Sequence, residues 1–142
     1  MGKRNLIIIV ILAIIPVIAA VTLICTKPGI EDIYLSSGNN RVSDGQKNND
    51  GYNFNKSNTD IYLIIEVRHI TTEDEIKVRW EKIENDSGKI IQKNIVYPEN
   101  NGSGKIMVSL VKKNDMYTPG TYITKVYLNG HMEVYEKFFI TE

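Results

Sequence analysis

The chain has 142 residues with 17 basic and 17 acidic side chains, so its formal net charge is zero. Without Lys3, Arg4 and Lys27, 14 basic and 17 acidic residues remain, and so mildly acidic a domain argues against nucleic acid as a partner. Cys25 is the one cysteine in the sequence, which excludes an internal disulfide and a site built from several thiolates.

The N-terminal segment predicts a membrane anchor. Lys3 and Arg4 precede Leu6–Cys25, an uncharged run of twenty residues. A helix of that length spans about 30 Å, the thickness of the hydrocarbon core of a bilayer. Because the basic residues precede the run, the positive-inside rule keeps the N-terminus in the cytoplasm. We therefore expect residues 1–27 to be a signal anchor, a single-pass transmembrane helix in the cell membrane with the C-terminal domain outside.

Two alternatives for this run stay open. A cleaved signal peptide would be cut after the small residues Ala19 or Ala20. A lipoprotein would be acylated at Cys25, although Thr22-Leu23-Ile24 lacks the small residue expected just before such a cysteine. In all three interpretations the C-terminal domain lies outside the cytoplasm.

Residues 28–59 are expected to form a juxtamembrane spacer and then a flexible loop. Ile33–Leu35 has the composition of a short strand. Ser36–Asp60 is rich in Asn, Asp, Gly and Ser, so it buries too little apolar surface to offset the entropy lost on ordering. Its acidic residues lack the spacing of a calcium-binding loop.

Residues 60–142 alternate between apolar and polar positions, which is the pattern of half-buried strands. Asn129-Gly130 predicts a two-residue hairpin turn, since both of its central positions need positive φ. The expected strands lie within Asp60–Ile70, Ile76–Ile83, Lys89–Val96, Lys105–Lys112 and the two halves of Tyr117–Ile140. With about seven strands and no helix in this part, the pattern predicts an all-β antiparallel sandwich with Trp80 in its core.

The residues that flank the last strands carry a resemblance. Trp80 in mid-chain, followed by Pro119-Gly120-Thr121-Tyr122, resembles immunoglobulin-like and fibronectin type III-like sandwiches. In that superfamily a Gly-x-Tyr often forms the tyrosine corner, whose hydroxyl bonds to the backbone a few residues upstream, and Tyr122 is the matching residue. The position of the second antibody cysteine is Thr124 here, so the intersheet disulfide is absent.

More narrowly, the order of these motifs, ending in Val126–Gly130 and Phe138–Ile140, is similar to small membrane-anchored prokaryotic surface proteins with one immunoglobulin-like sandwich and generally no assigned function. The resemblance covers Ile61–Glu142. It implies an immunoglobulin-like domain over residues 60–142 and structural roles for a small set of residues: Trp80, Gly120, Tyr122, Asn129 and Gly130.

The sequence offers no constellation for catalysis. His69 and His131 have no spacing that would bring them together on a metal, and no nucleophile or phosphate-binding motif is present. We therefore expect no enzyme activity, no cofactor and no metal. Tyr62, Tyr127 and Tyr135 are expected to point outward and form the candidate binding face.

These features favour a non-catalytic interaction or structural module, with the lipid bilayer and an unidentified protein or glycan as partners. The first alternative is a secreted or lipidated carbohydrate-binding accessory domain, which predicts coplanar aromatic side chains on one sheet. The second is a small hydrolase or enzyme inhibitor, which predicts polar groups converging on a concave site.

Overall fold

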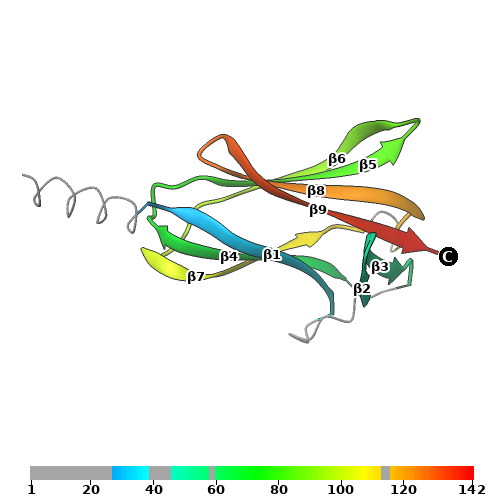
Figure 1. Cartoon of the computed structure of the whole chain (residues 1–142), viewed down its shortest axis with the longest axis horizontal. Coiled ribbons are helices and arrows are strands. Elements are labelled where there is room, and N and C mark those ends of the chain that lie inside the picture. Colours follow the sequence, from blue (N-terminus) through cyan, green and yellow to red (C-terminus); the bar gives the residue numbers. More distant parts are fainter. Residues whose placement is uncertain (1–26, 39–45, 58–59, 113–115) are drawn as a thin grey trace, which may run out of the picture.

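The computed structural model describes residues 27–38, 46–57, 60–112 and 116–142. These residues form strands in two layers and no helix (Figure 1). The strands are β1 (Gly29–Ser37), β2 (Gln46–Asn48), β3 (Gly51–Asn55), β4 (Ile61–Ile70), β5 (Ile76–Glu84), β6 (Ser87–Val96), β7 (Gly102–Leu110), β8 (Gly120–Leu128) and β9 (His131–Thr141). The expected all-β class is confirmed.

One sheet has the order β1-β4-β7 and the other the order β2-β3-β9-β8-β5-β6. Neighbouring strands are antiparallel except β3, which runs parallel to β9. Consecutive strands lie in different sheets at β1–β2, β3–β4, β4–β5, β6–β7 and β7–β8. Strands adjacent in sequence therefore often lie in different layers.

One hydrophobic core fills the space between the sheets. The apolar residues of β4, β5 and β8 alternate with partly exposed ones, so one side of each strand is buried. Trp80 is fully buried and meets Phe138 edge-on, with ring centroids 6.0 Å apart. Its indole N–H donates to Asn94 Oδ1 at 3.1 Å, so the one polar atom of the side chain is satisfied.

The structure differs from the expected flexible region at residues 28–59. β1 pairs with β4 along Gly29–Ser37, and β3 pairs with β9 through Tyr52↔Phe138 and Phe54↔Ile140. Tyr52 and Phe54 are 4% and 3% exposed. Two aromatic side chains at strand spacing bury enough area to order a segment whose composition is otherwise polar. Within the part of the chain that the structure describes, the strands thus begin at Gly29.

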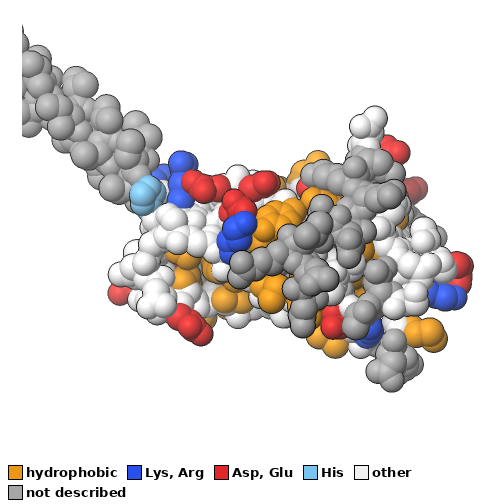
Figure 2. Space-filling model, turned by 90° about the horizontal axis from the view of Figure 1, so that it is seen from below, with side chains coloured by type: hydrophobic (Ala, Val, Ile, Leu, Met, Phe, Trp, Pro, Cys, Tyr) orange, Lys and Arg blue, Asp and Glu red, His pale blue; other side chains and the backbone are white. Residues whose placement is uncertain are grey.

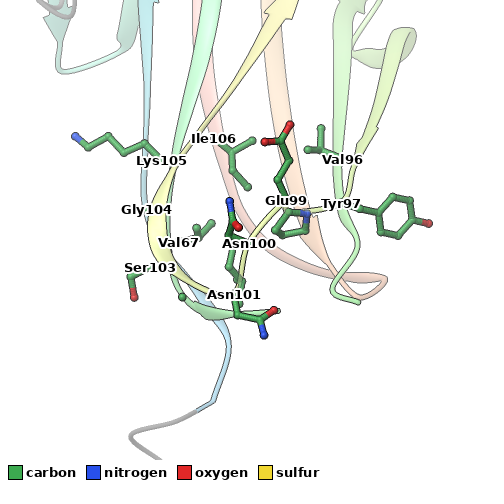
Figure 3. Close-up of a pocket in the computed structure, with 13 residues that line it drawn as sticks. Val67, Val96, Tyr97, Glu99, Asn100, Asn101, Ser103, Gly104, Lys105 and Ile106 are labelled. Carbon is green, nitrogen blue, oxygen red and sulfur yellow. The ribbon is translucent and has the colours of Figure 1, made fainter. Parts of the chain in front are cut away.

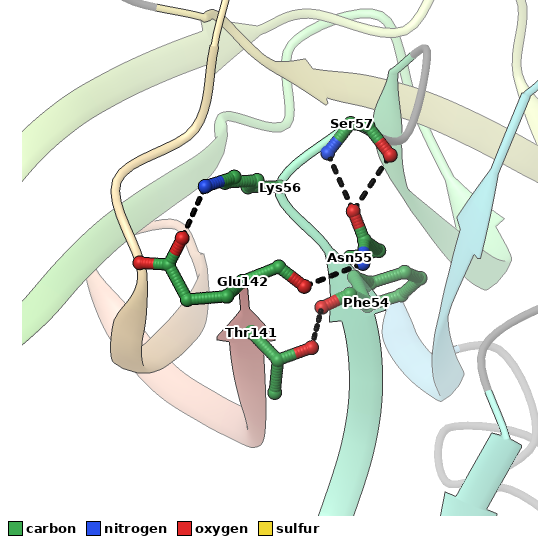
Figure 4. Close-up of polar contacts among 6 residues, drawn as sticks. All are labelled: Phe54, Asn55, Lys56, Ser57, Thr141 and Glu142. Carbon is green, nitrogen blue, oxygen red and sulfur yellow. Dashed lines mark hydrogen bonds and ion pairs between the residues drawn. The ribbon is translucent and has the colours of Figure 1, made fainter.

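The C-terminus is fastened to the end of β3 (Figure 4). Thr141 Oγ1 donates to the Phe54 carbonyl at 3.2 Å, and Asn55 Nδ2 donates to the Glu142 carbonyl at 2.6 Å. Lys56 forms an ion pair with the Glu142 carboxylate. These contacts hold β3 against β9 beyond their backbone pairing.

The Asn129-Gly130 turn joins β8 to β9, with φ of 50° and 83°. The Asn129 amide also donates to Asp74 Oδ1 at 2.7 Å, and its oxygen accepts from the Glu75 N–H at 2.9 Å. The hydrogen bond from Asn129 is the largest cause that lowers the pKa of Asp74, and bonds from Thr71 add to it. The two side-chain hydrogen bonds of Asn129 therefore join this turn to the turn between β4 and β5.

Among the described residues, no helix has the length and apolarity needed to cross a membrane. The expected anchor, Leu6–Cys25, lies outside the described residues.

Candidate binding face

The outer side of β9, β8, β5 and β6 is a grid of side chains set by strand register. Cross-strand partners share a face, so three rows run across the four strands. The rows are Met132–Tyr127–Lys77–Ile95, Tyr135–Lys125–Arg79–Lys93 and Lys137–Ile123–Glu81–Ile90. We call this surface the basic face.

Charge is strongly segregated on this surface. Its rows contain five of the 17 basic residues of the chain and one of the 17 acidic residues. Two further carboxylates, Glu75 and Glu133, lie at one end of the face, in the turn before β5 and at the β9 bulge. Apolar residues alternate with polar ones along these strands, so one side of each strand is buried and the basic side chains lie on the other side.

Glu81 organises the centre of the face. Its carboxylate accepts hydrogen bonds from Arg79 Nη2 at 2.7 Å and from Lys125 Nζ at 2.8 Å, so it forms an ion pair with each. The Glu81 side chain is only 4% exposed. Gly88 on β6 leaves room for this carboxylate, since a Cβ there would lie 2.6 Å from Glu81 Oε2. Because both cations are held by one buried acid, they have fixed positions without losing their net positive charge.

Arg79 links this network to an aromatic ring. Its Nη1 donates to the Tyr127 hydroxyl at 3.1 Å, and its guanidinium carbon lies 5.7 Å from the centroid of that ring. Tyr135 is paired with Lys125 on the neighbouring strand and is 60% exposed. Met132 and Ile95, at opposite ends of the first row, are 53% and 54% exposed.

The structure separates the three tyrosines predicted as one binding face. Tyr127 and Tyr135 lie on adjacent strands of the basic face. Tyr62 lies on β4 in the other sheet, where its hydroxyl contacts Asp60 at 3.4 Å. Burial is the main cause that raises the pKa of Tyr62, and the charge of Asp60 adds to it. A single aromatic face of all three is therefore not formed.

The residues assigned structural roles lie in the sandwich as follows. Trp80 is in the core, and Asn129 and Gly130 form the turn described above. The Tyr122 hydroxyl donates to the carbonyl of Thr118, four residues upstream, which is the bond that the tyrosine-corner resemblance implies. Gly120 has φ of 150°, and a Cβ there would lie 2.9 Å from Lys82 Cε.

The opposite face, on β1, β4 and β7, has no comparable charge segregation. Tyr34, Ile64 and Met107 form its central row, and Asp32, Glu66 and Lys105 form the next. Lys105 pairs with Glu66 at 2.6 Å. Figure 2 looks onto this face and shows hydrophobic side chains in its middle, with acidic and basic ones intermixed toward the end where β1 begins.

A cavity of about 410 Å³ opens at that same end of the sandwich, between the β6–β7 loop and the ends of β4 and β7. Val67, Val96 and Ile106 line it (Figure 3). Lys105 and Tyr97 point away from it, and its lining also includes the polar side chains of Glu99, Asn100, Asn101 and Ser103. These four side chains come from the β6–β7 loop and the start of β7.

Among the described residues, no group of three or more His, Cys, Asp or Glu side chains could hold a metal ion. His69 lies near the end of β4 and has φ of 50°. Its backbone N–H donates to Ser103 Oγ on β7 at 3.3 Å. His131 begins β9 after the Asn129-Gly130 turn.

No protein-family model and no curated protein matches the chain. The chain is similar to the solved structure of Pseudomonas fluorescens alkylpurine DNA glycosylase AlkC bound to DNA containing an abasic site analog, with a TM-score of 0.49 and 12% identity. The match covers 87% of this chain and 33% of that chain, so this protein spans about a third of the length of that one. So weak a likeness carries no argument about what this chain does.

One sequence-based expectation nevertheless needs correction. We expected no nucleic acid as a partner because the domain as a whole is mildly acidic. That expectation used the net charge of the whole domain. It missed that the strands place five basic side chains on one face. The exclusion is withdrawn.

Proposed function

We propose that this protein is a non-catalytic interaction module, an immunoglobulin-like sandwich held outside the cell by its N-terminal anchor. The strand order β1-β4-β7 against β9-β8-β5-β6 supports the immunoglobulin-like assignment, as does the Tyr122–Thr118 bond. The uncharged run Leu6–Cys25 behind Lys3 and Arg4 supports the anchor and the resemblance to membrane-anchored prokaryotic surface proteins.

The observation that carries the proposal is the basic face. It combines cations whose positions are fixed by a buried carboxylate with exposed tyrosine, methionine and isoleucine side chains. A rigid surface of this kind loses little conformational entropy when a partner binds. Exposed apolar groups beside charge are also typical of surfaces that bind other molecules.

A second candidate is the secreted or lipidated carbohydrate-binding accessory domain. Tyr127 and Tyr135 on adjacent strands favour it, because sugars bind against aromatic rings that stand side by side. The location of Tyr62 on the other sheet removes the third ring from that platform.

A photo-crosslinking amino acid placed at Tyr135 tests the proposal in cells that produce the full chain. We expect adducts from Tyr135 and none from the matched position Tyr62 on the opposite sheet. Adducts from neither position, or equally from both, would contradict a role for the basic face. Treating the adducts with nuclease, protease or glycosidase then identifies the class of partner.

The anchor is tested separately on protein extracted from membranes. An intact mass that retains residues 1–25 supports the anchor. A mass lacking the first nineteen or twenty residues indicates a released domain, and loss through Ile24 with added acyl mass indicates a lipoprotein.

A further inference from the structure

We propose that the basic face binds single-stranded nucleic acid. This inference rests on the proposed function of that face and names the class of partner. The phosphates would contact the lysines and the arginine, and exposed bases would stack on the tyrosines.

The arrangement of the cations suits a polyanion. Lys93, Arg79 and Lys125 are consecutive members of the middle row, so they step across three strands at about 4.8 Å per strand. Lys137 extends the positive charge on one side of that row, and Lys77 lies on the other side, where it is also paired with Glu75 at 3.0 Å. A chain of phosphates laid across the sheet meets several of these groups at once.

The tyrosines add a feature that charge alone does not supply. Tyr135 ends the middle row and is 60% exposed, and Tyr127 lies on the adjacent strand with its ring beside Arg79. Aromatic rings on the open face of adjacent strands, beside cations, provide a surface on which unpaired bases stack. Duplex DNA keeps its bases stacked inside, so this arrangement favours a single strand.

The composition of the face argues against an acidic protein as the partner. The buried centres of protein–protein interfaces are depleted in lysine, because closing them removes water from each ammonium group. Four of the five cations here are lysines; Lys77 and Lys125 lie inside the rows, and Lys93 and Lys137 lie at row ends. A flexible phosphate chain leaves such lysines hydrated.

The test uses the full chain in nanodiscs of zwitterionic lipid and a fluorescein-labelled oligothymidylate of about 20 nucleotides, a length above most single-strand site sizes. Fluorescence anisotropy over a salt series gives the affinity and its salt dependence. We expect binding, and we expect Lys93→Ala to reduce the slope of log K against log salt by about 0.7. Lys105→Ala, on the opposite face, is the matched control and should leave the slope unchanged.

The aromatic contribution is tested at Tyr135. Tyr135→Ser should weaken binding about five-fold or more, whereas Tyr135→Phe, which keeps the ring, should bind like the parent. The inference is overturned if the folded chain does not bind the oligonucleotide, if polyglutamate or duplex DNA binds as tightly, or if Lys105→Ala acts like Lys93→Ala. If oligothymidylate does not bind but Tyr135 still crosslinks to a protein or glycan, this inference fails and the proposed function stands.

Discussion

Tyr117 joins three segments through one hydroxyl group. It accepts the Ile61 N–H at 2.9 Å and donates to the Leu110 carbonyl at 3.1 Å, and the side chain is 5% exposed. Tyr117→Phe leaves both backbone groups without this partner, so we expect it to lower the free energy of unfolding by about 1–3 kcal/mol. Urea unfolding followed by the fluorescence of Trp80, the one tryptophan, measures the change. An unchanged midpoint would contradict this role.

The same tyrosine makes stability depend on alkaline pH. Burial is the main cause that raises its pKa from 10.0 to about 12. Its contribution is complete below pH 10, where both states are protonated, and is lost as pH rises toward 12 because only the unfolded state has released the proton. The free energy of unfolding should therefore fall between about pH 10 and about pH 12. In the Tyr117→Phe variant we expect this fall to be smaller than in the parent protein. Burial also raises the pKa of Tyr122, so part of the fall should persist.

Thr124 has an unsatisfied polar atom in the core. Its side chain is fully buried opposite Trp80, and its Oγ1 has no hydrogen-bond partner among the described residues. Thr124→Val keeps the shape and removes the hydroxyl, so we expect about 1 kcal/mol of added stability. Thr124→Ser retains the hydroxyl and loses a methyl group, so it should destabilise the fold. Paired urea titrations compare the two, and a destabilised valine variant would contradict the argument.

At the scale of elements, Gln92 connects the two sheets along one side. β6 and β7 are edge strands of different sheets. The Gln92 amide donates to the Ser109 carbonyl at 2.8 Å and accepts the Val111 N–H at 2.8 Å, as a neighbouring backbone would. Gln92→Leu should lower the free energy of unfolding by about 1–2 kcal/mol and speed hydrogen exchange at the backbone amide of Val111. Lys93→Leu, on the outer side of the same strand, is the control and should leave this exchange rate unchanged.

How much of the fold the sequence predicts depends on whether the signal is local. β4, β5, β8 and β9 were predictable because apolar alternation and the Asn129-Gly130 turn lie within each segment. β3 was not, because its order comes from pairing with β9, more than eighty residues away, and two aromatics were hidden in a polar stretch. Long-range pairing leaves no local periodicity to read.

The candidate site shows the same limit. Alternation placed Tyr127 and Tyr135 on the outer side of their strands, but it could not show that Tyr62 belongs to the other sheet. Nor could it show that Arg79 and Lys125, on neighbouring strands, share the buried carboxylate of Glu81. Gly120, predicted from the sequence to have a structural role, stands where a Cβ would collide with Lys82, whereas Gly88, which leaves room for Glu81, was not predicted.

At the scale of the whole molecule, the proposed anchor would limit how the domain sits on a membrane, because β1 begins close behind it. Gly29 already pairs with Arg68, so Thr26, Lys27 and Pro28 alone separate it from the apolar run. Three residues reach about 10 Å at full extension. The proposed anchor would therefore hold the end with the β4–β5 and β8–β9 turns close to the bilayer, whereas the C-terminus lies at the opposite end (Figure 1).

This geometry predicts unequal access at the two ends of the sandwich. In a chain whose Cys25 is replaced by serine, a cysteine at Thr72 near the bilayer should react more slowly with a bulky polyethylene glycol maleimide than one at Ser57 near the C-terminus. Inserting about twelve Gly and Ser residues after Lys27 should remove the difference, because a flexible linker of that length moves the domain away by about 20 Å. Detergent-solubilised protein supplies the control, since without a bilayer the two sites should react alike. Equal rates in membranes before the insertion would mean that the sandwich is not held there by its N-terminal end.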